Sequence, residues 1–289
     1  MTNPPINIIF LHGLNTFGDD LLHLGPVTLG RMDQHLRSQF EKQGARFFSV
    51  DGVGRGSPES QARIAIRKIS EESPFEKGAS VFLLGNSMGG LTARSLAKIW
   101  REDPTTNPRE LRLQGLLSWG TPHHGTSVAA MALEIPGTYP RLSRWLSKLG
   151  YSLTKNSSTY EHYTPASLRE FNQLHPILPQ APECTFLCTI PFRKSAPYFW
   201  SLYAKVHSLP TEALIRSWRS DEAPSDGFIS LESQTWGRSF GPYRLDHFTQ
   251  SGFFSILPTR SQKNDAATEF EKLCFDMKKL MTELLAKPL

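Results

Sequence analysis

The chain has 289 residues, of which 39% are hydrophobic and 20% charged, and its formal net charge is +5. This apolar fraction supports a packed core and argues against global disorder. The basic residues form no block of five or six, so we predict that nucleic acid is not a partner.

Targeting signals are not evident in the sequence. The first residues enter an apolar strand-like run without a basic segment, a long apolar segment or a cleavage site. No window of about 18 apolar residues is present. The sequence therefore predicts a soluble, cytoplasmic protein.

The three cysteines are Cys184, Cys188 and Cys274. The first two share one strand-like run, which would hold their sulfurs roughly 13 Å apart. Neither a C-x-x-C pair nor a nearby pair of histidines accompanies them. We expect buried free thiols, with neither a disulfide framework nor a metal site, and the sequence suggests no cofactor.

Strand-like and helix-like segments alternate along the first part of the chain. Apolar runs rich in β-formers predict buried strands at residues 6–11, 45–50, 79–84 and 113–119. Helical spacing or composition predicts helices at residues 26–43, 57–70 and 91–100. This alternation is typical of a parallel sheet covered by helices on both faces, so the expected fold class is α/β, in a single domain 1–289.

The alternation ends near residue 126. We interpret residues 127–182, which contain helical pieces rich in Leu, Trp, Tyr and Pro, as a cap or lid inserted over the active face, with a peripheral helical layer as the alternative. Residues 183–190 are expected to form a further strand of the sheet. The aromatic-rich segment 191–220 is a second insertion, either pocket lining or core. Residues 266–287 predict an amphipathic helix that packs against the sheet rather than on a membrane.

The segment GNSMGG at residues 85–90 lies between a predicted strand and a predicted helix. This is the context of the G-x-S-x-G nucleophile elbow, in which a strained turn exposes the serine hydroxyl. The free N–H groups of the helix N-terminus can stabilise an oxyanion beside it. We therefore predict that Ser87 is a catalytic nucleophile. A P-loop is excluded because the Lys-Ser/Thr pair is missing.

A serine nucleophile needs a base, and the base needs a carboxylate to orient it. On an α/β-hydrolase sheet the order is serine, acid, histidine. Of the nine histidines, only His247 follows every plausible acid. Asp226 is the favoured acid because it lies in an Asp-Gly turn before the strand-like residues 228–231. The alternatives for the acid are Asp221, Glu222 and Asp246.

Further histidines are expected along the same rim of the sheet. His12, His123 and His124 follow predicted strands, and we expect them to shape the pocket through hydrogen bonds. No carboxylate spacing supports a metal site among them.

Five motifs occur in the order found in bacterial triacylglycerol lipases of the α/β-hydrolase superfamily. They are HGL at 12–14, GNSMGG at 85–90, GTPHHGT at 120–126, SDGFIS at 225–230 and DH at 246–247. The chain resembles that group at both ends, but not across residues 127–220. The resemblance implies that Ser87, Asp226 and His247 are nucleophile, acid and base. It also implies an oxyanion hole made by the backbone N–H groups of Leu14 and Met88.

The chain departs from these lipases at three points. Asn86 precedes the serine where histidine is common, the signal peptide of the secreted members is missing, and no aspartate follows His247 closely, so a structural calcium is not carried over. We expect a serine hydrolase that cleaves carboxylic esters, in particular acyl or lipid esters, through an acyl-enzyme.

Several alternatives stay open on the same residues. The triad could serve an acyltransferase, a thioesterase or an amidase, or the fold could be a catalytically silent binding protein. The expected partner is an ester or lipid substrate, with transient contact with a lipid interface left open. The oligomeric state does not follow from the sequence.

Overall fold

The computed structural model describes residues 5–13, 16–17, 21–24, 27–31, 33–50, 56–72, 74–107, 109–138, 157–179, 181–189, 224–254 and 259–286. Within these residues, six strands form one parallel sheet in the order β5-β1-β6-β7-β8-β9. The strands are β1 (Asn7–Leu11), β5 (Arg46–Val50), β6 (Ser80–Asn86), β7 (Arg112–Trp119), β8 (Glu183–Cys188) and β9 (Arg238–Tyr243). The predicted α/β class is confirmed.

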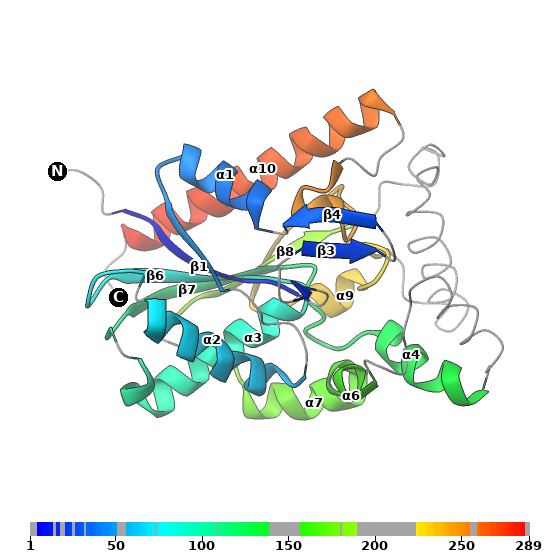
Figure 1. The fold of residues 1–289 in the computed structure, drawn as a ribbon, viewed down its shortest axis with the longest axis horizontal. Helices are drawn as coiled ribbons and strands as arrows, with labels where there is room; N and C mark the ends of the chain where they lie inside the picture. The colour runs from blue at the N-terminus through cyan, green and yellow to red at the C-terminus, as the bar shows by residue number, and fades with distance from the viewer. Residues whose placement is uncertain are drawn as a thin grey trace.

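Helices cover both faces of this sheet (Figure 1). One face carries α1 (Gln34–Lys42) and α10 (Arg260–Leu285), and the other carries α2 (Pro58–Glu72) and α3 (Met88–Glu102). Each of these four helices overlaps a predicted helix, although the bounds differ. The helix predicted at residue 266 begins at Arg260, because Thr259 and Gln262 form a capping box that fixes its N-terminus.

Strand β1 shows how the two halves of the core are separated. Ile8 and Phe10 pack in the cluster that includes α1 and α10, whereas Ile9 and Leu11 pack in the cluster that includes α2 and α3. Successive side chains of a strand point to opposite faces, so a strand buried on both faces must be apolar throughout. The central strands therefore read as continuous apolar runs in the sequence.

The helix predicted for residues 26–43 is wrong in its first half. Residues Val27–Arg31 form strand β4, which pairs antiparallel with β3 (Leu21–Leu24) in a small sheet that also contains β2 (Thr16–Phe17). The apolar positions Val27 and Leu29 fit the period of a strand as well as the spacing that suggested a helix. Pairing with the neighbouring strand decides between the two.

Two elements near the site also differ from the prediction. Residues 228–231 are not a strand: Ser230 forms an isolated bridge with Ser225 and then caps α9 (Leu231–Gln234), accepting the N–H of Ser233. Strand β9 was not predicted. Its sequence, RSFGPY, contains Gly and Pro and is largely exposed, as an edge strand permits.

In the described parts of the predicted insertion, the regular secondary structure is all helical. These parts are residues 127–138, 157–179 and 181–182. Tyr163, Leu168 and Phe171 belong to one hydrophobic cluster with Met88 and Leu91, which lie at the start of α3. These helical elements are α4 (Ser127–Thr138), α6 (Ser157–Tyr160), η3 (Glu161–Tyr163) and α7 (Pro165–Leu174). A cap role for this region stays a prediction, and residues 191–220 lie outside the described residues.

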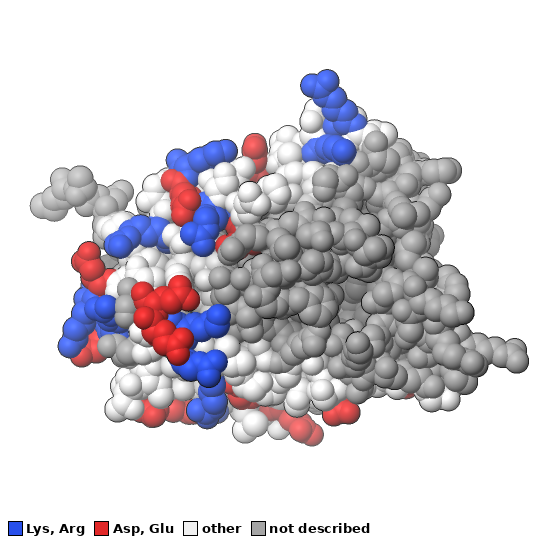
Figure 2. Space-filling model, in the orientation of Figure 1, with Lys and Arg blue, Asp and Glu red and all other residues white. Residues whose placement is uncertain are grey.

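Charges on the described surface are mixed in sign. Figure 2 shows Lys and Arg side chains interspersed with Asp and Glu side chains on the visible face. Among the described residues, no helix is both long and apolar enough to cross a membrane.

The three cysteines are free and buried, as predicted. Burial raises the pKa of Cys184 to about 11, and it raises the pKa of Cys188 well above its ordinary value. The thiols are therefore part of the core.

Candidate active site

Ser87 occupies the turn between strand β6 and helix α3. Its backbone has φ 53° and ψ −129°, a conformation that costs a non-glycine residue about 1–3 kcal/mol. The turn needs a close approach between elements: a Cβ on Gly89 would overlap the carbonyl oxygen of Leu11 at the end of β1. The glycine lets α3 begin directly against the sheet, and the serine side chain stays partly exposed.

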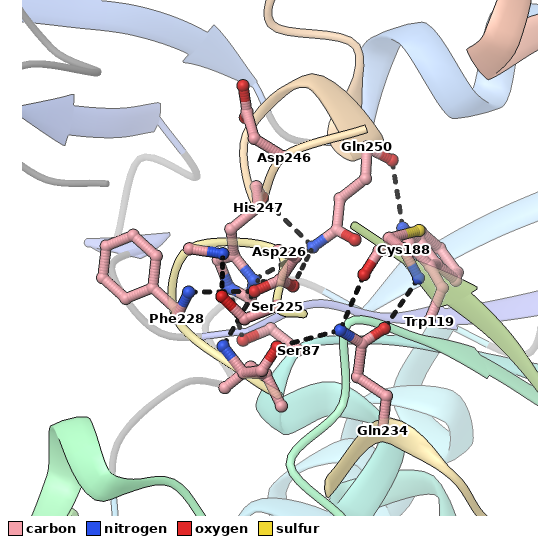
Figure 3. A network of polar contacts seen from close by, with 12 residues as sticks. Ser87, Trp119, Cys188, Ser225, Asp226, Phe228, Gln234, Asp246, His247 and Gln250 are labelled. Atoms are coloured by element: carbon pink, nitrogen blue, oxygen red, sulfur yellow. Dashed lines mark hydrogen bonds and ion pairs between the residues drawn. The ribbon is translucent and has the colours of Figure 1, made fainter. Parts of the chain in front are cut away.

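His247 lies beside Ser87 although it follows β9, 160 positions further along the chain. Its Nε2 is 3.1 Å from the Oγ of Ser87, and its Nδ1 is 2.7 Å from Oδ2 of Asp226 (Figure 3). The imidazole is 14% exposed and the carboxylate is fully buried. The structure thus brings together the three side chains that the sequence predicted. The ring of Phe228 packs against the imidazole at a centroid distance of 5.1 Å.

Asp226 is held by its own turn. Its Oδ1 accepts the backbone N–H groups of Phe228 at 2.9 Å and Ile229 at 2.8 Å, and its backbone oxygen accepts the N–H of His247 at 2.9 Å. Gly227 makes the turn with φ 100°. A buried carboxylate needs such donors to offset the loss of water. They leave Oδ2 facing the imidazole.

Asp246, a rival acid, is used differently. Its Oδ1 accepts the N–H groups of Phe248 and Thr249, both at 2.9 Å. Figure 3 shows its carboxylate directed away from the imidazole. Burial raises its pKa. The side chain closes the turn that carries His247, whereas the other two rivals, Asp221 and Glu222, lie outside the described residues.

One half of the predicted oxyanion hole can be placed. Met88 is the first residue of α3, so its backbone N–H belongs to the helix N-terminus, where amides have no intrahelical acceptor. A Cβ on Gly13 would lie only 2.7 Å from the Cβ of Ser87, so the segment after β1 passes close to Ser87. Leu14, the other predicted donor, lies outside the described residues.

Two of the histidines predicted at the rim, His123 and His124, make hydrogen bonds with the scaffold. His123 is buried, with Nε2 3.0 Å from Oγ of Ser118 and Nδ1 3.4 Å from Nη1 of Arg94. Burial, together with the positive charge of Arg94, holds the pKa of His123 well below its ordinary value. His124 places Nε2 3.0 Å from the backbone oxygen of Thr235. His12 is also buried.

Arg94 of helix α3, a buried cation that was not predicted from the sequence, lies beside His123. The guanidinium of Arg94 is 3.6 Å from the centroid of the Trp236 ring and 3.6 Å from a carboxylate oxygen of Glu183. It also donates to Asn172 at 2.8 Å, which connects α3 to α7. Burial lowers the pKa of Arg94 to about 10, and burial raises the pKa of Glu183 against the opposing effect of Arg94.

Gln250 is the second residue near the site that sequence reasoning missed. It is fully buried, and its Nε2 lies 3.4 Å from Oδ2 of Asp226 and 3.0 Å from Nδ1 of His247. Its position three residues after the histidine carries no motif. A single sequence offers no signal for it.

Similarity to known proteins was found in sequence over 72% of the chain and, more extensively, in structure. No family model matches the sequence. Triacylglycerol lipase 2 of Saccharomyces cerevisiae is 23% identical over 212 residues, which cover 72% of this chain and 58% of the yeast protein. The chain thus aligns with less than two thirds of that relative's length.

Solved structures extend the comparison to three dimensions. The lipase of Staphylococcus hyicus matches with a TM-score of 0.66 and 14% identity, covering 98% of this chain and 97% of the lipase. A mature Bacillus licheniformis lipase matches with a TM-score of 0.56 and 17% identity, over 94% of this chain and 92% of the lipase. A metagenomic carboxyl esterase matches with a TM-score of 0.60 and 13% identity, over 94% and 77% of the two chains.

The chain has the α/β-hydrolase fold. On this fold a nucleophile, an acid and a histidine follow one another in that order along the chain, and the predicted residues Ser87, Asp226 and His247 occur in the same order. The serine stands after β6, an inner strand of the described sheet, and the histidine follows β9 at its edge. The α/β-hydrolase fold therefore explains how residues so distant in sequence meet at one rim.

Proposed function

We propose that the chain is a carboxylic ester hydrolase in which Ser87 is the nucleophile, His247 the general base and acid, and Asp226 the carboxylate that orients the histidine. The observation that carries the proposal is the continuous line of contacts from Oγ through the imidazole to Oδ2, at 3.1 Å and 2.7 Å. These distances are within the range expected for a nucleophile and its base.

The chemistry proceeds in two halves. Oγ of Ser87 attacks the ester carbonyl carbon while Nε2 of His247 takes the hydroxyl proton, and the resulting oxyanion turns toward the N–H of Met88 and its partner donor. The tetrahedral intermediate collapses, the C–O bond to the alcohol breaks, and Nε2 returns the proton to the leaving oxygen. A water molecule, deprotonated by the same nitrogen, then releases the acid and regenerates the serine.

Asp226 stabilises the imidazolium that exists between these proton transfers. Its second oxygen is engaged by backbone N–H groups, so the carboxylate cannot rotate away from Nδ1 without losing them. This fixes the tautomer with hydrogen on Nδ1, which leaves Nε2 free to accept the serine proton.

The substrate class proposed is an acyl or lipid ester. The matched relative and two of the matched structures are named as lipases, and the third as a carboxyl esterase. Tyr163, Leu168 and Phe171 belong to one hydrophobic cluster with Met88, the residue after Ser87, which supports the further proposal that residues 127–182 form a cap above the site.

The first test is turnover of a panel of p-nitrophenyl esters by Ser87→Ala, with Ser95→Ala as the matched control. Ser95 lies on the same helix and is fully buried, with no hydrogen bond to its Oγ among the described atoms. We expect Ser87→Ala to lose activity by roughly 10⁴-fold or more and Ser95→Ala to retain it. Wild-type turnover in Ser87→Ala would refute the assignment.

Chain length and aggregation state test the substrate class. A series of esters of increasing acyl length, assayed below and above the concentration at which they form micelles, should show a rise in activity at the interface for a capped lipase. Saturation on short monomeric esters would indicate an esterase without interfacial activation. Product analysis with a competing alcohol or amine separates hydrolysis from acyl transfer, and amide and thioester substrates of the same acyl group test amidase and thioesterase activity.

A further inference from the structure

Gln250 is a candidate for a fourth functional side chain beside the serine, histidine and aspartate. It belongs to the short helix η6 (Thr249–Ser251), which follows His247, and its side chain reaches back beneath the imidazole. Nε2 lies 3.4 Å from Oδ2 of Asp226 and 3.2 Å from the backbone oxygen of His247 (Figure 3). The same nitrogen is 3.0 Å from Nδ1 of His247.

The orientation of this amide follows from its partners. An amide nitrogen carries two hydrogens, and two acceptors face it: Oδ2 of Asp226 and the carbonyl oxygen of His247. With the amide reversed, its oxygen would face both of those oxygens and gain only a share of the Nδ1 hydrogen. The nitrogen therefore belongs at this position, with the positive end of the amide dipole toward the imidazole.

The surrounding chain holds Gln250 in place from two directions. Its backbone oxygen accepts Nε1 of Trp119 at 3.0 Å, and its N–H donates to the backbone oxygen of Asp246 at 3.0 Å. Gly120, with φ 54°, stands directly against the amide: a Cβ there would lie 2.7 Å from Oε1 and nearer still to Nε2. The first glycine of the GTPHHGT segment thus leaves the space that Gln250 fills.

We propose that Gln250 is a positioning residue for the acid and the base, which fixes the Asp226 carboxylate against Nδ1 and ties it to the backbone of His247. This inference deepens the proposed function and rests on it. The buried carboxylate then receives two backbone donors on Oδ1, and the histidine and the glutamine on Oδ2.

Two measurable effects follow from this arrangement. Without the amide donor the imidazole and carboxylate lose a restraint, so the fraction of enzyme in the reactive geometry falls and kcat falls with it. The amide also places the partial positive charge of its hydrogens beside the imidazole. Its removal should move the acidic limb of the pH profile of kcat/KM to higher pH.

The test uses Gln250→Met, which keeps length and apolar volume but removes both donors, and Gln250→Glu, which keeps the shape. Assayed with a p-nitrophenyl ester, each variant should lose roughly 10- to 100-fold in kcat while KM changes by less than about threefold. The acidic limb should move to higher pH in both, and further in Gln250→Glu because an added carboxylate favours the imidazolium.

Gln262→Met is the matched control. Gln262 is also a buried glutamine, but its side chain caps α10 by accepting the N–H of Thr259 at 3.2 Å. Its replacement should lower the melting temperature and leave the acidic limb unchanged. A loss of activity in the Gln250 variants with an unmoved limb, or folded variants with wild-type kcat, would overturn the positioning role.

The proposed function is checked separately in the same samples with a fluorophosphonate, which labels an activated serine. If Ser87 of the wild-type protein is labelled but the Gln250 variants react at the wild-type rate with the same pH dependence, only the positioning role is wrong. If Ser87 of the wild-type protein is not labelled, the proposed function fails and the positioning role fails with it.

Discussion

The Nε2 atom of His247 lies 3.1 Å from the Oγ atom of Ser87, although 160 positions separate the two residues in the chain. The sheet produces this approach because β6 and β9 are parallel, so the segments that follow them leave the sheet at the carboxyl ends of its strands. Asp226 completes the arrangement from a third segment. Ser87 and Asp226 can each be tested against a residue of the same type, Ser95 and Asp246, that makes different contacts.

Asp226→Asn should show whether Asp226 or its alternative, Asp246, is the carboxylate that orients His247. The substitution keeps the shape but removes the charge that stabilises the imidazolium, so we expect kcat to fall by roughly 10³- to 10⁴-fold. Asp246→Asn can retain the oxygen that accepts the N–H groups of Phe248 and Thr249, and we expect a loss of less than about tenfold. Steady-state kinetics of both variants measures the two losses in kcat. A larger loss in Asp246→Asn than in Asp226→Asn would make Asp246 the acid.

Gly89→Ala should disrupt the elbow through packing alone. The added methyl group would overlap the carbonyl oxygen of Leu11, so α3 must move away from β1. We expect a loss of at least about 3 kcal/mol in the free energy of unfolding, or failure to fold. Gly137→Ala, in α4, meets nothing within 4 Å, and its melting temperature should stay within a few degrees of the wild type. Equal stability of the two variants would contradict this account of the turn.

The inner strands of the sheet were largely predictable because they are buried on both faces. Ile8 to Leu11 and Val81 to Leu84 read as continuous apolar runs, since successive side chains enter opposite halves of the core. The elbow was predictable for a related reason: the glycines around Ser87 are needed wherever a helix starts directly against a strand.

Elements at the edges carried weaker signals. Strand β9 has only one buried position, Tyr243, and contains Gly241 and Pro242, so its sequence resembles a loop. Residues Val27–Arg31 fit two periods, and pairing with β3 decided between them. Arg94 and Gln250 could not be found because buried polar side chains are defined by partners from other segments.

Arg94→Met should destabilise the protein by leaving Glu183 buried without its cation. We expect a loss of about 3–5 kcal/mol in the free energy of unfolding, partly restored in the double variant Arg94→Met with Glu183→Gln. Lys77→Met is the control, because Lys77 and Glu110 form an ion pair at the surface, with 66% and 69% of their side chains exposed. That change should stay within about 1 kcal/mol. Additive effects of the two buried substitutions would show that Arg94 and Glu183 are not coupled.

His123 should make stability fall in mild acid. Burial, then the charge of Arg94, holds its pKa in the folded protein well below the ordinary value. The unfolded chain therefore takes up a proton below about pH 6.5 that the folded chain does not, which favours unfolding by up to about 1.4 kcal/mol per pH unit. The same direction holds for His35 and His175, whose pKa values are also lowered by burial.

Urea unfolding of the wild type and His123→Gln, between about pH 7.5 and pH 5, measures this contribution. On acidification the free energy of unfolding should fall less steeply in the variant, because unfolding of the variant takes up about one proton fewer. A smaller slope should remain from His35 and His175. Parallel curves for the two proteins would assign the acid sensitivity to other groups.

The most direct test of the central proposal is the site and rate of reaction with a fluorophosphonate. Peptide mapping of the labelled wild-type protein should place one phosphonyl group on Ser87, and the labelling rate should fall by roughly 10³-fold or more in His247→Gln. Label on another residue, or equal labelling rates in the two proteins, would contradict the account.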